Sequence, residues 1–224
     1  VPAAKRYPQG RIALGVAARL FPVKGAALAL HAVALLAQSH DVQLEVAGAG
    51  PELPRLQALA ASLGISGRVT FHGAVSDMAA FFVRIDCLLH VPITEAFGLV
   101  ALEAAAHGCP VLTAAVDGLP EAVEDGVSGV CLAPTLPLAA YVELGGSLEG
   151  LPQQVYTPDR DALATPQAVD PVVLARTVEE LFGDARRFES FSAAASAHVL
   201  RSPNFAAHVR DVLVVVDEFL ARRR

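Results

Sequence analysis

Tryptophan is absent from the sequence, methionine occurs once, and aromatic residues make up only 6% of its 224 positions. Charged residues are also scarce, at 18%, whereas 54% of the residues are hydrophobic, with alanine, valine and leucine dominant. An antiparallel sheet often keeps one polar face, but parallel strands are buried on both faces by helices. The composition therefore favours a parallel sheet covered by helices over an antiparallel sandwich.

Disulfide patterns, basic clusters and membrane spans are missing as well. Cys87, Cys109 and Cys131 are an odd number and lie near apolar runs, so we expect buried thiols and a cytoplasmic location. The net charge is −6, and the one basic run, Arg222–Arg224, is interpreted as a solvated helix end, so no nucleic-acid partner is expected. No run approaches the roughly 18 apolar residues of a membrane span. Membrane association would therefore need a part of the protein outside this sequence.

Short apolar runs alternate with helical patterns through residues 11–133. Ser76 is the expected N-cap of the third helix, and Gly64 the residue that follows the second. Strands are predicted at 12–17, 42–47, 69–71, 87–91, 111–113 and 127–132, and helices at 25–38, 52–63, 77–84 and 98–107. This alternation predicts an α/β fold, a Rossmann-like doubly wound parallel sheet with the strand order 3-2-1-4-5-6. Ligands of such sheets bind at the carboxyl ends of the strands.

The segments outside this core differ in composition. Residues 1–10 lack a signal-peptide core and indicate a linker from an upstream segment, so the sequence is expected to be part of a longer protein. Residues 134–170 are rich in Pro, Gly, Gln and Thr without a period, which predicts an irregular excursion. Residues 171–224 form a predicted C-terminal helical extension, with Asp170 before its first proline. Its helices are predicted at 171–182, 184–200 and 204–222, the last with an apolar face of Val209, Val212, Leu213, Val216 and Phe219.

Arg19 and Lys24 are the first chemical signal, and they lie between the first strand and its helix. The amino end of a helix attracts anions. Arg offers a planar fork of donors and Lys a point charge, so the pair suits the two phosphates of a diphosphate. Taken alone, the two residues favour the alternative, a solvated loop with incidental charges. A cation on such a loop would contribute little to folding.

Gly48-Ala49-Gly50-Pro51 follows the second strand and resembles the start of a dinucleotide-binding fingerprint. The third glycine of that fingerprint would stand at Leu53, so a nicotinamide cofactor is disfavoured. A Walker-type phosphate loop is also absent, because Lys24 lacks both the preceding glycine and a following Ser or Thr.

The stretch from Thr94 to Glu103 is the most informative. Glu95 precedes a predicted helix, and Glu103 lies more than one turn inside it. The backbone amides of residues 97–99 would be unpaired donors at the helix start, and Gly98 would let a ligand approach closely. Amide donors flanked by two carboxylates suit a phosphate with hydroxyl groups on either side, as in a nucleotide sugar. The alternative is an amphipathic helix with one capping and one exposed glutamate.

Gly118-Leu119-Pro120-Glu121 is by itself only a turn and a helix start, but it completes an ordered set of motifs over about residues 11–132. The set is Arg19 with Lys24-Gly25, Gly48 to Glu52, Phe71-His72-Gly73, Glu95 to Leu99 with Glu103, Gly108-Cys109-Pro110-Val111, and Gly118 to Glu121. It resembles the C-terminal domain of group 1 (family 4) glycosyltransferases, which are retaining enzymes of the GT-B fold. The chain departs from that pattern at Ala18, Val23 and Asp117, where the family favours Gly, Glu and Gly, and in its long segment 134–170.

The resemblance implies one donor-binding domain for a nucleotide diphosphate sugar. Its catalytic residues would be Arg19 and Lys24, which grip the diphosphate, and Glu95, which contacts sugar hydroxyls. Glu103 would hold the ribose, and Val75 would lie near the base. The other implied donor-binding residues are Gly50, Ala96, Phe97, Gly98 and Leu99. An N-terminal acceptor-binding domain of the same enzyme would be missing, so this part alone would transfer no sugar, and neither a cofactor nor a protein-bound metal would be needed.

Three alternatives stay open. A GT-B-fold sugar-nucleotide epimerase would need its own acid–base carboxylates, and a nucleotide-binding domain without catalysis would keep only part of the site. Asp159-Arg160-Asp161 has the Asp-x-Asp spelling of a metal-dependent transferase of the other major fold. The histidines have no metal-ligand spacing, and His72 and His107 are expected to be structural or near the donor.

Overall fold

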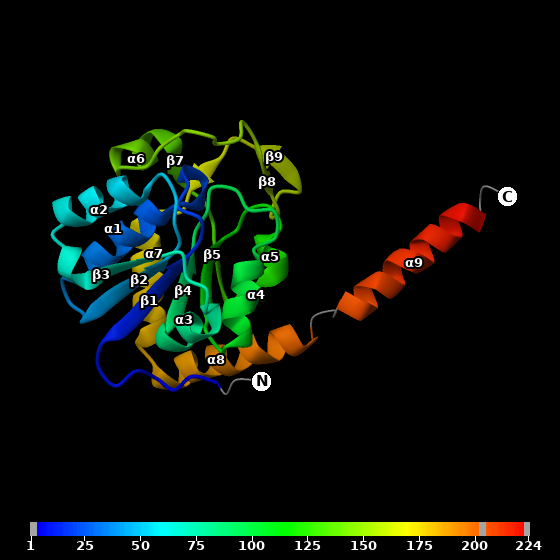
Figure 1. Ribbon diagram of the computed structural model, residues 1–224, viewed down its shortest axis with the longest axis horizontal. Coiled ribbons are helices and arrows are strands. Elements are labelled where there is room, and N and C mark those ends of the chain that lie inside the picture. The colour runs from blue at the N-terminus through cyan, green and yellow to red at the C-terminus, as the bar shows by residue number, and fades with distance from the viewer. Residues whose placement is uncertain (1–3, 202–204, 222–224) are drawn as a thin grey trace.

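Six parallel strands form one central sheet in the predicted order β3-β2-β1-β4-β5-β6 (Figure 1). The computed structural model describes the backbone of residues 4–201 and 205–221 and the side chains of residues 4–200 and 209–220. The strands are β1 (Ile12–Ala17), β2 (Val42–Ala47), β3 (Val69–Gly73), β4 (Cys87–His90), β5 (Val111–Ala114) and β6 (Gly129–Leu132). β1 pairs with β2 on one side and with β4 on the other, so the strand order reverses between β1 and β4. The Rossmann-like fold class is confirmed.

Helices cover both faces of the sheet because successive residues of each strand point to opposite sides. Leu88 of β4 packs in one core with Phe81 and Ala101, whereas its neighbour Leu89 belongs to a second core with Leu28 and Leu174. The first core is formed by α3 (Met78–Arg84), α4 (Leu99–Ala106) and α5 (Leu119–Ala122), and the second by α1 (Ala26–Leu36), α2 (Leu53–Ser62) and α7 (Pro171–Phe182). Burial on both faces explains the continuous apolar runs of the strands.

Most helix ends match the sequence signals, with one correction. Gly64 follows α2 with a φ of 71°, and the Asp170 carboxylate accepts a hydrogen bond from the Val172 N–H at the start of α7. The expected N-cap of α3 was Ser76, but the helix begins at Met78 and its cap is Asp77, whose side chain accepts from the Ala80 N–H. Asp and Ser are both favourable caps, so sequence preference alone did not separate these two neighbours.

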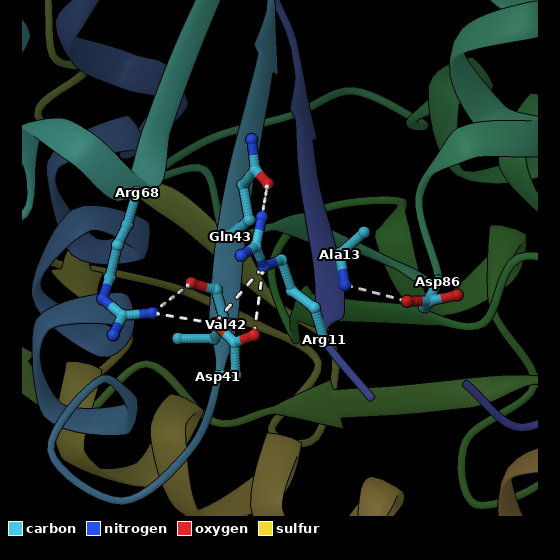
Figure 2. A network of polar contacts seen from close by, with 7 residues as sticks. All are labelled: Arg11, Ala13, Asp41, Val42, Gln43, Arg68 and Asp86. Carbon is cyan, nitrogen blue, oxygen red and sulfur yellow. Dashed lines mark hydrogen bonds and ion pairs between the residues drawn. The ribbon is translucent and has the colours of Figure 1, made fainter. Parts of the chain in front are cut away.

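A polar network ties the amino ends of the strands together, at the sheet edge opposite to the expected ligand site (Figure 2). The Arg11 side chain donates to Asp41 and Gln43, and Arg68 donates to Asp41 and to the Val42 carbonyl. The hydrogen bond from Arg11 lowers the pKa of Asp41. These side chains are largely exposed, so the network aligns the strands rather than contributing much stability.

The segment 134–170 is organised, which corrects the expectation of an irregular excursion. It contains β7 (Leu136–Pro137), α6 (Leu138–Glu143), β8 (Val155–Thr157), β9 (Ala162–Ala164) and β10 (Gln167–Ala168). β7 pairs with β10, and β8 forms an antiparallel hairpin with β9. The buried Tyr141 hydroxyl donates to the Pro22 carbonyl at 3.0 Å, which anchors α6 to the loop after β1. Strands of two or three residues carry too little pattern to be recognised from the sequence.

The two ends of the described chain meet the core differently. Residues 4–10, expected as a linker, lie against the last helices of the core, since the Tyr7 hydroxyl donates to the Phe182 carbonyl and the Lys5 N–H to Ser192 of α8 (Ala185–Arg201). The final helix, α9 (Phe205–Ala221), projects away from the sheet (Figure 1). Arg222–Arg224 lie outside the described residues.

The apolar face predicted for the last helix is exposed. Val212, Val216 and Phe219 are 46%, 45% and 54% exposed, and Val214 and Val215, on other sides of the helix, are exposed as well. Among the helices that the structure describes, none combines the length and the apolar character that crossing a bilayer requires.

Candidate functional site

Two adjoining hollows lie at the carboxyl edge of the sheet, beside the point where the strand order reverses. The Glu95 hollow, of about 350 Å³, is lined by Ala17, Ala18, Arg19, Lys24, His90, Glu95 and residues 96–100. The Glu103 hollow, of about 370 Å³, is lined by residues 17–19, 47–49, Ala74, Val75, Met78, Val100 and Glu103. Because Arg19 and Val100 belong to both, the two hollows form one groove. The groove brings together all the predicted site residues except Gly50.

Lys24 reaches the groove because the loops after β1 and β4 are joined. A short 3-10 helix, η1 (Pro22–Lys24), ends at Gly25, which has a φ of 64°. A Cβ atom at Gly25 would lie 2.2 Å from the Val91 carbonyl oxygen, so only glycine permits this approach. The Ile93 N–H donates to the Val23 carbonyl at 2.7 Å. These contacts fix Lys24 opposite the loop that carries Glu95.

Lys24, Glu95 and His90 form a polar cluster in the groove. Lys24 Nζ lies 2.6 Å from Glu95 Oε2, and the two side chains are only 17% and 19% exposed. His90, at the end of β4, is buried and its Nε2 lies 3.4 Å from the same oxygen. The contacts with His90 first, and then with Lys24, lower the pKa of Glu95 to about 2 against the opposing effect of burial. Glu95 is therefore an anion at neutral pH.

The burial of Lys24 corrects the expectation of a solvated loop cation, since this cation is shielded by its partner carboxylate. His90 was not predicted as a site residue. The only sequence signal for it was a polar residue at the end of an otherwise apolar strand. Arg19 remains exposed, with its guanidinium carbon 5.5 Å from the centre of the Phe21 ring.

Helix α4 begins at the floor of the groove, but Gly98 acts differently from the expectation. Gly98 is buried and has a φ of 82°, and a Cβ atom there would lie 2.3 Å from Leu119 of α5. The glycine thus lets the loop turn tightly and pack on α5 rather than opening space for a ligand. Ala96, Phe97 and Leu99 are the exposed residues at this helix start.

Gly50 lies outside the groove because it packs against a neighbouring loop. A Cβ atom at Gly50 would lie 2.3 Å from the Leu20 carbonyl oxygen, and the Glu52 N–H donates to that same oxygen at 3.1 Å. Gly48 and Ala49, one and two positions earlier, line the groove instead. The Gly48-x-Gly50 motif therefore joins the loops after β1 and β2.

Glu103 and Val75 face the second hollow from α4 and from the loop after β3. Glu103 is exposed, and among the described residues it has no ion-pair partner. His107 lies one turn further along, where its Nδ1 is 2.8 Å from the Glu103 carbonyl and its ring lies near Phe82. His72 of β3 pairs with Glu45 of β2. Both histidines thus have structural partners.

Asp117 is the second residue that sequence reasoning missed as a contributor to the site. It follows β5, has a φ of 48°, and its carboxylate accepts from the Thr94 hydroxyl and the Glu95 N–H at 2.6 and 3.0 Å. The following Gly118 packs against this loop, because a Cβ atom there would lie 2.2 Å from the Ala96 carbonyl oxygen. The sequence signal was the departure from the glycine that the family favours at position 117.

The alternative metal motif lies elsewhere. Asp159 and Asp161 are in the turn of the β8–β9 hairpin, and Asp161 accepts a hydrogen bond from the Tyr156 hydroxyl at 2.8 Å. In the part of the chain that the structure describes, three His, Cys, Asp or Glu side chains do not gather anywhere as a metal site would require. A hollow of about 790 Å³ lies beside this hairpin, lined among others by Val116, Glu124, Tyr156 and Gln167. It contains none of the predicted site residues.

Comparison with known proteins assigns the family. The model for glycosyl transferases group 1 matches residues 2–144, which is more than half of the sequence. The chain belongs to the group 1 glycosyltransferases. The D-inositol 3-phosphate glycosyltransferase of Mycobacterium marinum is 43% identical over 138 residues, 54% of this chain and 29% of that protein. The enzyme of the same name from Streptomyces griseus is 38% identical over 160 residues, 66% of this chain and 34% of that protein. The matched part of the chain spans about a third of the length of these curated relatives.

Solved structures of this family and its neighbours share the fold. Anabaena HepE, crystallised with UDP and glucose, superposes with a TM-score of 0.72 at 20% identity over 93% of this chain and 49% of that chain. Sucrose-phosphate synthase from Thermosynechococcus elongatus gives a TM-score of 0.72 at 21% identity, over 96% and 47%. The C-terminal domain of a group 1 family protein (LpcC) from Francisella tularensis gives 0.67 at 19% identity, over 91% of this chain and 95% of that chain. The fold is that of one half of a GT-B glycosyltransferase.

Proposed function

We propose that this chain is the donor-binding domain of a retaining glycosyltransferase that uses a nucleotide diphosphate sugar. The observation that carries the proposal is the groove itself. Lys24, Arg19 and the start of α4 lie at one part of it, and Glu103 and Val75 at the adjoining part. Cations beside a helix amino end suit a diphosphate, and a carboxylate beyond them suits the hydroxyls of a ribose.

In this proposal Lys24 and Arg19 bind the diphosphate and stabilise the negative charge that develops on it as the sugar departs. Such fixed charges accelerate a reaction because they match the transition state better than the ground state. In the structure Lys24 is held by Glu95, so binding of a phosphate would draw the ammonium group away from the carboxylate or place it between the two anions. His90 would then remain beside Glu95, with its Nε2 3.4 Å from the carboxylate.

Glu95 is assigned to the hydroxyls of the donor sugar, and the amides at residues 97–99 to the phosphates. Glu103 is assigned to the ribose and the backbone near Val75 to the base. The low pKa of Glu95, about 2, supports an acceptor of hydroxyl hydrogen bonds rather than a general acid. None of these roles needs a metal held by the protein.

The comparisons suggest the first ligands to test. HepE was crystallised with UDP and glucose, so UDP and UDP-glucose are the first donor probes. The curated relatives are named for D-inositol 3-phosphate, which is the first acceptor to assay. We propose that the acceptor is bound by a further domain of the same enzyme, because the matched part of the chain spans only about a third of those relatives. The free thiols among the described residues suit a reducing cytoplasm.

Isothermal titration calorimetry of this chain tests the proposal. The panel is UDP, GDP and ADP, each with one corresponding nucleotide sugar, against the wild type, Lys24→Ala and the control Arg176→Ala. Arg176 is a surface cation of α7 that pairs with Glu180. It lines neither of the two hollows. We expect one nucleotide series to bind and only Lys24→Ala to weaken it. Binding of no member of the panel, or equal loss in both variants, would contradict the proposal.

A further inference from the structure

Asp117 makes more hydrogen bonds than any other side chain near the groove in the part of the chain that the structure describes. One carboxylate oxygen, Oδ2, accepts from the Thr94 hydroxyl at 2.6 Å and from the Glu95 N–H at 3.0 Å. The other, Oδ1, accepts from the Tyr156 N–H at 2.9 Å. Its own backbone N–H donates to the Tyr156 carbonyl at 3.0 Å. Asp117 therefore bridges the Glu95 loop and β8.

The hydrogen bonds of the Asp117 side chain, and not its backbone conformation, distinguish aspartate from glycine at this position. A φ of 48° lies in the left-handed region, where glycine fits without strain and Asp is one of the few other residues found. Glycine would satisfy the backbone but would leave the Glu95 N–H and the Thr94 hydroxyl without their acceptor. The carboxylate of Asp117 thus supplies two hydrogen bonds to the Glu95 loop that a glycine at position 117 could not supply.

The contacts form a continuous path into the groove. Tyr156 lies in the hairpin of β8 and β9. Its backbone N–H donates to the Asp117 carboxylate, and its carbonyl accepts from the Asp117 N–H. Asp117 fixes the backbone of Glu95, and the Glu95 carboxylate contacts Lys24 at 2.6 Å. A part of the segment 134–170 is thereby connected to the polar cluster of Lys24, Glu95 and His90 through a single side chain.

We infer that Asp117 is a positioning residue which, held by Tyr156, sets the place of the Glu95 carboxylate and so governs recognition of the donor sugar more than of the nucleoside diphosphate. This inference rests on the proposed function. The diphosphate meets Lys24, Arg19 and the start of α4, none of which hydrogen-bonds to Asp117. The sugar hydroxyls depend on the position of Glu95, which does.

The test compares Asp117→Gly with Asp161→Gly. Both changes replace an aspartate with a φ of 48° by glycine, so the backbone effect is matched. Asp161 lies in the turn of the hairpin and contacts the Tyr156 hydroxyl but not the Glu95 loop. In a third variant, Asp117→Asn, the side chain has one oxygen acceptor, which can serve either the Glu95 loop or the Tyr156 N–H but not both. Thermal melting of all three confirms that each is folded before binding is measured.

Calorimetry with UDP and UDP-glucose, or with the GDP or ADP pair if the panel selects it, gives the functional result. For Asp117→Gly we expect binding of the nucleotide sugar to weaken by about tenfold and binding of the bare diphosphate to change by less than about twofold. Asp117→Asn should recover part of the loss, and Asp161→Gly should leave both ligands within about twofold of the wild type. Equal weakening of both ligands by Asp117→Gly would overturn the inference.

Amide hydrogen exchange without any ligand separates this inference from the proposed function. Asp117→Gly should speed exchange in peptides that cover residues 93–97 and 155–157, whereas Asp161→Gly should affect only the hairpin. Unchanged exchange at residues 93–97 in Asp117→Gly would overturn the positioning role alone. If the wild type binds no nucleotide while the exchange result holds, the proposed function fails, and the recognition role fails with it.

Discussion

Lys24 Nζ lies 2.6 Å from Glu95 Oε2, although the two residues come from loops after different strands, β1 and β4. Parallel strands with reversed order place these loops side by side, so the ion pair is a consequence of the topology. The contact with His90, together with that of Lys24, favours the ionised form of Glu95.

Replacing Lys24 by Ala should weaken binding of the nucleoside diphosphate by about 1–3 kcal/mol, the range of a charge-assisted contact. Because Lys24 is also the partner of a shielded carboxylate, we expect the free energy of unfolding to fall by about 1–2 kcal/mol. Calorimetry and urea denaturation measure the two effects. Arg176→Ala is the control, with both quantities expected within about 0.5 kcal/mol of the wild type. A loss of stability without a loss of affinity would show a purely structural pair.

The two glutamates should differ in the part of the ligand that each recognises. Glu103→Gln is expected to weaken the bare nucleoside diphosphate and its sugar conjugate alike, because Glu103 lies in the hollow with Val75. Glu95→Gln should weaken the sugar conjugate more, because Glu95 is assigned to the hydroxyls of the donor sugar, which the bare diphosphate lacks. The measurement is the ratio of the two Kd values for each variant. If the ratios of the two variants agree, the assigned division of roles is wrong.

The fold and much of this groove were predictable because their signals are local. Arg19, Lys24 and Glu95 lie in loops that follow strands, Glu103 lies in the helix that begins after Glu95, and the strand order places all four at one edge. Asp117 was not recognised because its carboxylate accepts hydrogen bonds from Glu95 and Tyr156, which are 22 and 39 positions away in the sequence. Helix and strand periodicity does not predict contacts at such separations. Gly50 was misplaced because a glycine that fits against a loop looks the same in sequence as one that admits a ligand.

Glu95 should also contribute to the pH dependence of stability. Its pKa in the folded protein, about 2, lies below the ordinary 4.5, so folding favours the ionised form. The contribution is complete above pH 4.5 and is lost as the pH falls from there towards 2. The difference in unfolding free energy between the wild type and Glu95→Gln should therefore shrink between about pH 6 and about pH 3. Denaturant titrations at both values measure it, and a constant difference would contradict the assignment.

Replacing His90 by Gln should raise the pKa of Glu95, because the contact with His90 is the largest cause of its lowering. Carbon-13 NMR of the glutamate carboxyl groups follows this titration directly in the wild type and the variant. His107→Gln is the matched control, since His107 contacts the Glu103 carbonyl and Phe82 rather than Glu95. If both variants leave the Glu95 titration unchanged, Lys24 alone sets its charge.

The last prediction concerns turnover. All residues assigned to the donor lie on this chain, and its matched part spans only about a third of the curated relatives, so we expect residues 1–224 to bind donor but not to transfer its sugar. Val212, Val216 and Phe219 on α9 are exposed, and we propose that a further domain of the enzyme covers them. The assay supplies UDP-glucose, or the nucleotide sugar that the panel selects, with D-inositol 3-phosphate, and follows both release of the diphosphate and formation of the glycoside. Release of diphosphate without glycoside would indicate slow hydrolysis and agrees with an absent acceptor site. Glycoside formed by this chain alone, and abolished in Lys24→Ala, would show that the acceptor site lies within residues 1–224 and that the division into two domains is wrong.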